Sequence, residues 1–522
     1  MTSVPTNRKE RLIIATTAGC LVTVIWFLMT WRYGLDLADE GFYWYGAQRV
    51  LRGEVPMRDF MAYDIGRYYW AAVIMWLVGD DGIWGARLSA VIFQAIGIVV
   101  GVYACLSVSK KVGFALWAFA LLIGCILTVW VFPYYKVYDH TVSVILVACI
   151  FSMLKRRIPH VWFLGGICIG LAAVIGRNHG VYGGFSVLLI VAHISIFEKS
   201  IKETVKLIGF FCIGIFIGFL PNIWMMLAID GFFIAFLNSI RLLFEYAATN
   251  IALPIPWPWM VHLDGVGVIT SATLITTGGF FLLLIIFPIV LVLSLLNRYV
   301  VTGDDMRLML ISIIVTSVPY AHYTFSRADT VHLGLGILPV IMGLLIIAGY
   351  LKGPRAFLLG FLLLVFSIIA ALDSQPYFTF SLLKKPYIIT EITGDYVYIR
   401  PKISTKLDLA SDVIENKMKK NESFLAVPDM PSLHAIYRQK MPLWEIYSLI
   451  NRSSKFELDE INRLNNNKPD YIFLSNHPLD SNVNFQYSKI HPLIYEWINL
   501  NYISSSSGTL VFDPYFYNYT LK

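Results

Sequence analysis

Long, uninterrupted runs of apolar residues constrain this chain more than any other feature. A helix that crosses a membrane needs about 20 consecutive apolar residues. We identify eleven candidate runs, of which 140–154 and 161–176 are short. They lie near residues 12–31, 84–108, 112–132, 140–154, 161–176, 181–197, 205–229, 266–296, 306–321, 333–350 and 355–372. The chain is therefore expected to be an α-helical, polytopic membrane protein.

The composition agrees with this expectation. Of 522 residues, 57% are hydrophobic and only 14% are charged, whereas soluble domains carry roughly 25% charged residues. A soluble enzyme of this length could not bury so much apolar surface. All six cysteines lie inside apolar runs, so we expect neither a disulfide framework nor a thiolate metal site.

Charge divides the chain into two parts. Residues 1–372 hold 25 Lys/Arg and 18 Asp/Glu, and residues 373–522 hold 16 of each, so the net charge of +7 belongs to the apolar part. Basic residues gather in alternate loops, for example at Arg11, Lys110 and Lys155. Because cytoplasmic loops carry this excess, we expect the N-terminus in the cytoplasm. An odd number of helices then places residues 373–522 outside, on a protein of the cytoplasmic (inner) membrane.

The part after residue 372 has a different pattern. Short apolar runs at Phe424–Val427, Tyr471–Leu474 and Thr509–Phe512 alternate with helical patterns at Leu407–Lys420 and His491–Asn501. Such alternation is typical of a small α/β domain. We therefore expect two domains, a membrane domain over 1–372 and an extracytoplasmic α/β domain over 373–522. Leu382–Pro401 is expected to connect them.

The first outer loop, residues 32–83, is too long for a simple connection. Within it, Asp39 is expected to cap a helix that ends near Gly53. The apolar stripe of that helix is Tyr43, Ala47, Val50 and Leu51. We expect the helix to lie in the membrane interface and to hold Asp39 and Glu40 at the mouth of the bundle.

Several ionisable residues fall on the predicted outer side. Ionisable groups at membrane depth are costly and often functional. They are Asp39, Glu40, Asp64 and Arg67 in the first loop, Lys136, Asp139 and His140, then Arg177 and His179, and finally Arg327, Asp329 and His332. Four loops that bring acids, cations and histidines to one side indicate a cluster.

Simpler roles stay open for individual members of this set. Lys136 and Arg177 have the placement of cations that extend to the membrane interface. His179 and His332 fit histidines that are satisfied at helix ends. Asp139 can cap a helix. Arg327 and Asp329 can form a structural ion pair.

An Asp-Glu pair just after the first helix, on a loop with surface helices, resembles the GT-C superfamily of membrane glycosyltransferases. The strings Asp39-Glu40-Gly41, Gly66-Arg67-Tyr68-Tyr69, Gly176-Arg177-Asn178-His179-Gly180 and Arg327-Ala328-Asp329-Thr330-Val331-His332 are similar to a bacterial branch of that group. Its members include the protein O-mannosyltransferases and the lipid A aminoarabinose transferase.

The resemblance implies a hexosyl- or pentosyltransferase that takes a sugar from a polyprenyl phosphate, undecaprenyl phosphate in bacteria, with inversion at the anomeric carbon. Asp39 is then the catalytic base, and Glu40 orients it or binds the acceptor. The donor phosphate is bound by cations and histidines, supported by neighbouring polar residues. The phosphate-binding candidates are Arg67, Lys136, Arg177, His179, Arg327 and His332, and the supporting residues are Asp64, Asp139, His140 and Asp329. The partners implied are this donor lipid, a glycan, lipid or protein acceptor, and membrane lipids, without nucleic acid.

Alternatives remain at this level. The spacing of His179 and His332 is not that of a metal site, so no cofactor is predicted, although some relatives use a divalent cation and Asp39 would then be its ligand. A transporter or flippase of polyprenyl-linked glycans is a second possibility, and an O-antigen ligase or polymerase is a third. The irregular, aromatic loop 230–265, with Trp257 and Trp259, is either a segment that covers the lipid carrier or an interfacial anchor.

Overall fold

The structure is a computed structural model that describes residues 7–198, 201–246, 250–262, 267–296, 304–351, 353–504 and 516–522. The chain divides into two compact units. The helical unit comprises Met1–Trp31, Ala90–Phe233 and Leu237–Lys384, and the sheet unit comprises Arg32–Ser89, Ile234–Phe236 and Lys385–Lys522. The division at residue 372 into a membrane domain and an extracytoplasmic domain stays a prediction.

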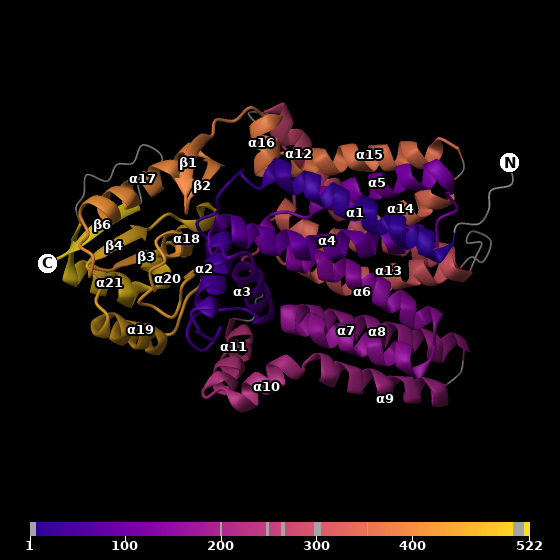
Figure 1. Cartoon of the computed structure of the whole chain (residues 1–522), viewed down its shortest axis with the longest axis horizontal. Helices are drawn as coiled ribbons and strands as arrows, with labels where there is room; N and C mark the ends of the chain where they lie inside the picture. The colour runs from indigo at the N-terminus through magenta and orange to yellow at the C-terminus, as the bar shows by residue number, and fades with distance from the viewer. Residues whose placement is uncertain are drawn as a thin grey trace. The chain divides into compact units, whose positions relative to one another are not determined.

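Most helices of the helical unit are long and run side by side in Figure 1. In its first half the helices are α1 (Arg8–Thr30), α4 (Ile83–Ser107), α5 (Gly113–Trp130), η1 (Tyr134–Lys136), α6 (Val137–Lys155), α7 (Pro159–Ile175) and α8 (Arg177–Glu198). Those of the second half are α9 (Ile201–Gly218), α10 (Leu220–Ala228), α11 (Phe232–Tyr246), α12 (Val268–Leu296), α13 (Asp304–Phe325), α14 (Thr330–Tyr350), α15 (Arg355–Ala371) and α16 (Pro376–Ser381).

Each of the eleven predicted spans coincides with a helix or a helix pair. Among the described residues, eight helices are long and apolar enough to cross a membrane. The span predicted at 205–229 is bent by 50° between α9 and α10, where Pro221 cannot donate a backbone hydrogen bond to the preceding turn. The two remaining helices, α7 and α15, are apolar but have only 17 residues each. The chain is thus a multi-pass membrane protein.

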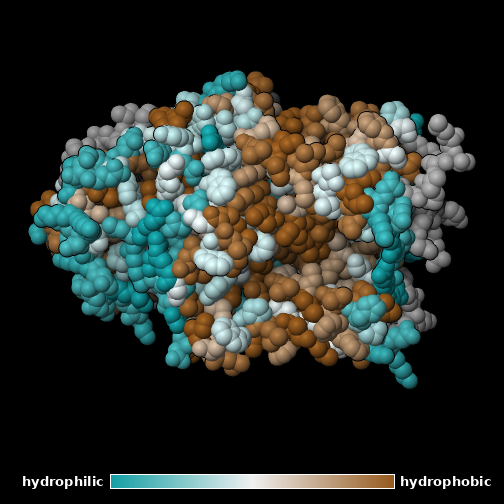
Figure 2. Space-filling model, viewed as in Figure 1, coloured by the Kyte–Doolittle hydropathy of each residue, from teal (hydrophilic) through white to brown (hydrophobic). Residues whose placement is uncertain are grey.

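Burial differs strongly among these helices. Most of α14 is buried, whereas most of α1 and α12 is exposed. After its first turn, which contains Thr330 and His332, α14 is apolar on all sides. Such a helix can be surrounded by other helices of the bundle. The exposed apolar residues of the outer helices form the wide hydrophobic surface in Figure 2, which suits contact with lipid tails.

One segment of the helical unit differs from its prediction. The irregular loop expected at 230–265 contains a helix, α11, whose apolar residues have helical spacing. The Pro-rich part that follows packs tightly on α12, because a Cβ atom added to Gly278 would lie 1.9 Å from the carbonyl oxygen of Pro256. The rings of Trp257 and Trp259 stack at 5.5 Å.

The sheet unit has a four-stranded sheet in the order β3-β4-β6-β5. Its strands are β3 (Phe424–Val427), β4 (Tyr471–Ser475), β5 (Tyr502–Ser504) and β6 (Phe516–Leu521). β3 and β4 are parallel, with Phe424 opposite Tyr471, and β6 is antiparallel to both of its neighbours. All four residues of β3 are buried, as expected for a run without alternation.

Helices accompany this sheet, and two more come from the first loop. Within the described residues they are α2 (Asp39–Leu51), α3 (Gly66–Val78), α17 (Pro401–Asn416), α18 (Pro431–Ile436), α19 (Ser454–Asn466), η2 (Leu479–Ser481), η3 (Val483–Phe485), α20 (Tyr487–Ile490) and α21 (Pro492–Asn501). The α/β character predicted for the C-terminal part is thus confirmed.

Two details of the C-terminal prediction need comment. The connection expected at Leu382–Pro401 holds a hairpin, β1 (Ile388–Ile392) and β2 (Asp395–Ile399), whose turn contains Gly394 at a φ of 91°. The apolar run Thr509–Phe512 lies outside the described residues.

Candidate functional site

One acid of the pair at the start of α2, Glu40, is held by an arginine from α4. Arg87 Nε donates to Glu40 Oε1 at 2.7 Å, and Arg87 Nη2 donates to Glu40 Oε2 at 2.8 Å. The same Nη2 donates to the carbonyl oxygen of Gly34 at 2.6 Å. Both side chains are buried, with 7% of Glu40 and 3% of Arg87 exposed. Glu40 is therefore a fully engaged carboxylate that fixes the first turn of α2.

Asp39 has a different environment. Its Oδ1 accepts a hydrogen bond from the hydroxyl of Tyr447 at 2.8 Å, and the residue is half-buried. Among the described residues, its Oδ2 has no hydrogen-bond partner. Burial, followed by the Asp39 charge, raises the pKa of Tyr447 well above its ordinary value, so the phenol stays a donor. Asp39 thus has one fixed oxygen and one that remains able to accept a proton.

The helix predicted from Asp39 is confirmed, but the capping role of Asp39 is wrong. The N-cap is Ala38, which makes no side-chain cap, and Asp36 Oδ1 instead accepts from Ala38 N at 2.9 Å. Asp39 is instead the first residue of the helix, and its carboxylate accepts a hydrogen bond from Tyr447.

α2 is buried on more than its apolar stripe. The string Asp39-Glu40-Gly41 ends in a glycine because α18 passes close by. A Cβ atom on Gly41 would lie 2.2 Å from the backbone nitrogen of Ser432. On the same helix, Gln48 donates to the carbonyl oxygens of Asp81 and Ala435.

The other two predicted residues of the first loop also lie in the sheet unit. Asp64 is buried just before α3, and Arg67 is half-buried in its first turn. The charges of both Asp39 and Arg67 act on the hydroxyl of Tyr63. Arg67 therefore lies in the electrostatic neighbourhood of Asp39.

A short polar motif precedes α14 in the helical unit. Asp329 caps this helix, and its Oδ1 accepts from His332 N and from His332 Nδ1, both at 2.8 Å. Arg327 Nε donates to Asp329 Oδ2 at 2.9 Å, and Arg327 Nη1 donates to the carbonyl oxygen of Ile251 at 3.1 Å. Burial alone would raise the pKa of Asp329, but the hydrogen bonds from His332 and the Arg327 charge hold it below its ordinary value.

This arrangement orients His332. Its Nδ1 faces the carboxylate, and among the described residues Nε2 has no hydrogen-bond partner. The carboxylate at Nδ1 fixes the orientation of the imidazole ring. Nε2 of such a ring can donate to an oxyanion.

A second polar network is fully enclosed between α6, α8 and α13. His179 Nε2 lies 3.0 Å from Asp139 Oδ1, and His179 Nδ1 lies 2.8 Å from the hydroxyl of Tyr320. The hydroxyl of Tyr323 donates to the same Asp139 oxygen at 3.1 Å. These contacts engage both ring nitrogens of His179, Nε2 with the Asp139 carboxylate and Nδ1 with the Tyr320 hydroxyl. Since both ring nitrogens are used inside the protein, we leave His179 out of the proposed phosphate contacts.

The remaining predicted residues lie near the starts of α6 and α8. His140 Nδ1 is 2.7 Å from the carbonyl oxygen of Lys136, and its Nε2 is buried against α14 at Gly334. Lys136 is half-buried beside the ring of Tyr135. Arg177 donates to Ser239 Oγ at 2.7 Å. The capping role considered for Asp139 is wrong, because the N-cap position of α6 is Lys136, whose side chain makes no capping hydrogen bond.

No family model matches the chain, and no curated protein matches it. Among solved structures, the chain is similar to an oligosaccharyltransferase from Archaeoglobus fulgidus. With the apo form it shares 10% identity at a TM-score of 0.47, over 99% of this chain and 74% of that one. With a complex of the archaeal enzyme, an inhibitory peptide and a dolichol-phosphate, it shares 10% identity at a TM-score of 0.42, over the same shares of each chain. Because the identity and the TM-scores are this low, neither structure assigns a role to a residue of this chain.

Sequence reasoning missed the partners that decide these roles. Arg87 stands in the second turn of the apolar helix α4, and a charged residue inside an apolar helix is often functional or paired. Tyr447 lies 408 residues after Asp39, and no local pattern connects the two. Tyr320 and Tyr323 are the hydroxyl partners in the buried network and read as ordinary aromatics of a membrane helix.

Proposed function

We propose that this chain is a GT-C-type glycosyltransferase that moves a sugar from a polyprenyl-phosphate carrier to an acceptor hydroxyl with inversion at the anomeric carbon. The observation that carries the proposal is the unequal state of the two adjacent acids. Glu40 uses both oxygens on Arg87, whereas Asp39 is held through one oxygen and keeps the other open. An acceptor hydroxyl needs a positioned base of this kind.

The proposed reaction is a single displacement. The acceptor hydroxyl donates its proton to Asp39 Oδ2 while its oxygen attacks the anomeric carbon on the face opposite the phosphate. The bond between that carbon and the phosphate oxygen breaks, and its electron pair leaves with the carrier phosphate. Tyr447 keeps the carboxylate oriented throughout, so the C-terminal part contributes directly to the proposed base.

The leaving phosphate needs cations and hydrogen-bond donors rather than an acid. We propose His332 Nε2 and the guanidinium of Arg327 as donors, since Asp329 orients both side chains. Arg67, Lys136 and Arg177 remain further candidates for binding the donor phosphate. The charge pattern of the loops supports the outer side of the membrane as the place of reaction and an extracytoplasmic C-terminal part.

The decisive experiment compares Asp39→Asn with Asp412→Asn. Both replace one carboxylate by an amide, but Asp412 is exposed on α17. Mass spectrometry of surface glycans and lipids, from cells with and without the protein, identifies the product first. We expect Asp39→Asn to lower product formation about 10²- to 10⁴-fold, as for loss of a general base, while Asp412→Asn keeps it. A fully active Asp39→Asn protein would refute the base assignment.

Two further measurements separate the alternatives. Purified protein is given a monophosphate-linked sugar or a pyrophosphate-linked oligosaccharide, and activity with only the second favours a ligase or polymerase. Flux of the lipid-linked glycan into vesicles without glycosidic bond formation favours a transporter. Loss of activity in a chelator and its recovery with a divalent cation would make Asp39 a metal ligand, as an alternative to its role as base.

A further inference from the structure

The helical unit contains a cavity at the end that carries the N-terminus of α1. Its volume is about 760 Å³, and it lies between α1, α4, α6 and α7. Among the described residues that line it, five are cationic and one is acidic: Arg8, Arg11, Lys110, Lys155, Arg156 and Asp305. These residues take no part in the proposed transfer reaction.

Three of the five cations have partners within the protein. Lys155 pairs with Asp305. Arg11 donates to the carbonyl oxygens of Leu106 and Ser109 at the end of α4. Lys110 Nζ lies 4.4 Å from the centre of the Tyr350 ring. The two remaining cations that line the cavity are Arg8 and Arg156.

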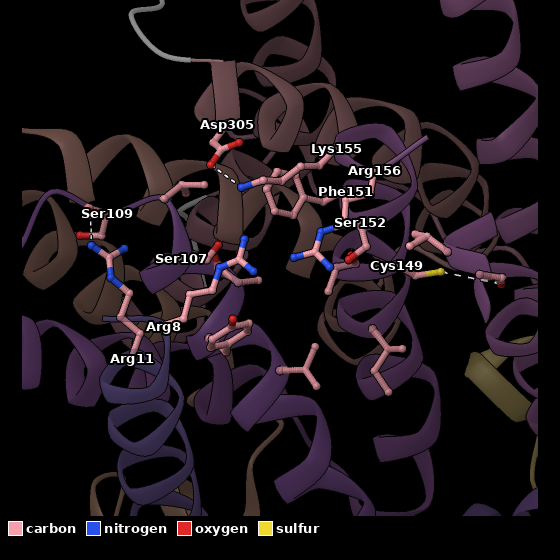
Figure 3. Close-up of a pocket in the computed structure, with 18 of the residues that line it drawn as sticks. Arg8, Arg11, Ser107, Ser109, Cys149, Phe151, Ser152, Lys155, Arg156 and Asp305 are labelled. Atoms are coloured by element: carbon pink, nitrogen blue, oxygen red, sulfur yellow. Dashed lines mark hydrogen bonds and ion pairs between the residues drawn. The ribbon is translucent and has the colours of Figure 1, made fainter. Parts of the chain in front are cut away.

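Among the described residues, the guanidinium groups of Arg8 and Arg156 have neither a hydrogen bond nor an ion pair. Figure 3 shows their guanidinium groups turned toward one another from α1 and from the end of α6. Both residues are exposed, so water screens the repulsion between their like charges, and an anion held between them would remove it. Planar guanidinium groups match the oxygens of phosphate in two-point hydrogen bonds.

The walls of the cavity indicate what carries the phosphate. Apolar side chains line it along α4, α6 and α7, namely Val100, Ala104, Ile145, Ala148, Val161 and Leu164. Leu164 is 58% exposed, so this wall reaches the lipid-facing surface of α7. A soluble anion would gain nothing from these residues, whereas an acyl chain would cover them.

We propose that this cavity binds the phosphate headgroup of an anionic membrane lipid between Arg8 and Arg156, with its acyl chain along α7. Basic cavities between membrane helices are known to hold such headgroups. The basic residues in this position also fit the general excess of positive charge in cytoplasmic loops, but that excess alone does not require two unpartnered arginines to face each other.

The test uses native mass spectrometry of the full chain in detergent. The probes are phosphatidylglycerol, phosphatidylcholine with the same acyl chains, and inorganic phosphate. We expect the wild-type chain to prefer phosphatidylglycerol and the Arg8→Gln/Arg156→Gln variant to bind it about 100-fold more weakly, as for the loss of two charge-assisted hydrogen bonds. Lys9→Gln removes the adjacent exposed charge, which does not line the cavity, and should bind as the wild type does.

The outcomes are distinct. Equal binding of phosphatidylglycerol by the double variant and the wild type overturns the site. Inorganic phosphate that binds as tightly as the lipid, and is lost in the double variant, overturns the lipid as its source. If the double variant unfolds, which thermal unfolding in detergent reports, the single variants Arg8→Gln and Arg156→Gln are each expected to weaken lipid binding by a smaller factor, and unchanged binding in both overturns the proposal.

Discussion

Replacing Arg87 by methionine tests how the first turn of α2 is held. The change leaves the Glu40 carboxylate buried, with only 7% of its side chain exposed, and removes the donor to Gly34. Breaking a buried ion pair on one side costs roughly 3–5 kcal/mol, because the remaining charge is left without compensation. We expect the Arg87→Met chain to be destabilised locally by at least about 3 kcal/mol, which corresponds to a factor of roughly 100 or more in the opening equilibrium.

Hydrogen exchange of the α2 amides in the full chain measures this opening. Arg52→Met is the matched control, since Arg52 ends the same helix and makes only a half-exposed contact of 3.6 Å with Asp81. Such surface pairs are worth at most about 1 kcal/mol. The double variant Glu40→Met/Arg87→Met removes both charges and should recover most of the lost protection, since apolar pairs can replace buried ion pairs. Exchange in Arg87→Met no faster than in the control would refute the view that this pair holds α2.

Three further predictions concern the sheet unit. Tyr447→Phe removes the donor to Asp39 Oδ1 and should reduce product formation about 10-fold, as for one lost hydrogen bond to a charged group, with folding unchanged by thermal unfolding; full activity would count against the orienting role. Burial raises the pKa of Glu460 to about 6, so its stabilising contribution is complete below about 4.5 and is lost as the pH rises through 6. Thermal unfolding should therefore show Glu460→Gln gaining stability relative to the wild type between pH 5 and 7.5, by about 2 kcal/mol at most, and a pH-independent difference would contradict the assignment. Gly41→Ala places a methyl group against Ser432 N and should cost about 1–3 kcal/mol of stability, whereas Gly53→Ala, with open space around it but a φ of 83°, tests strain alone.

The membrane helices were predictable because each is specified by its own residues. An apolar run of about 20 residues defines a span without reference to its neighbours. Two features were not predicted. The span at 205–229 is bent near Pro221, and the segment before the Pro-rich stretch around Trp257 forms the helix α11. The hairpin β1–β2 was missed as well. Its strands are short, and β2 gains a further partner through Tyr33 and Tyr398, which no local pattern reports.

The candidate site was predictable only in part, because partners that are distant in sequence decide what each charged residue does. The Asp39-Glu40 pair could be located from its position after the first span. Its division of roles depends on Arg87 and Tyr447, and the latter lies in the C-terminal part. Likewise, Arg327, Asp329 and His332 are close in sequence and do contact one another, whereas the partner of Asp139, His179, comes from another helix.

The adjacency of Asp39 and Glu40 argues for different roles of the two acids in the proposed reaction. Consecutive residues on a helix point about 100° apart and do not face each other. The two carboxylates can therefore have different partners, and in the structure Glu40 pairs with Arg87 while Asp39 accepts a hydrogen bond from Tyr447. Two carboxylates that act together on one carbon atom would have to lie three or four residues apart on a helix, or on different elements. The sequence Asp-Glu at a helix start is thus suited to a single base with an anchored neighbour, which is what a displacement with a phosphate leaving group requires, since no general acid is needed.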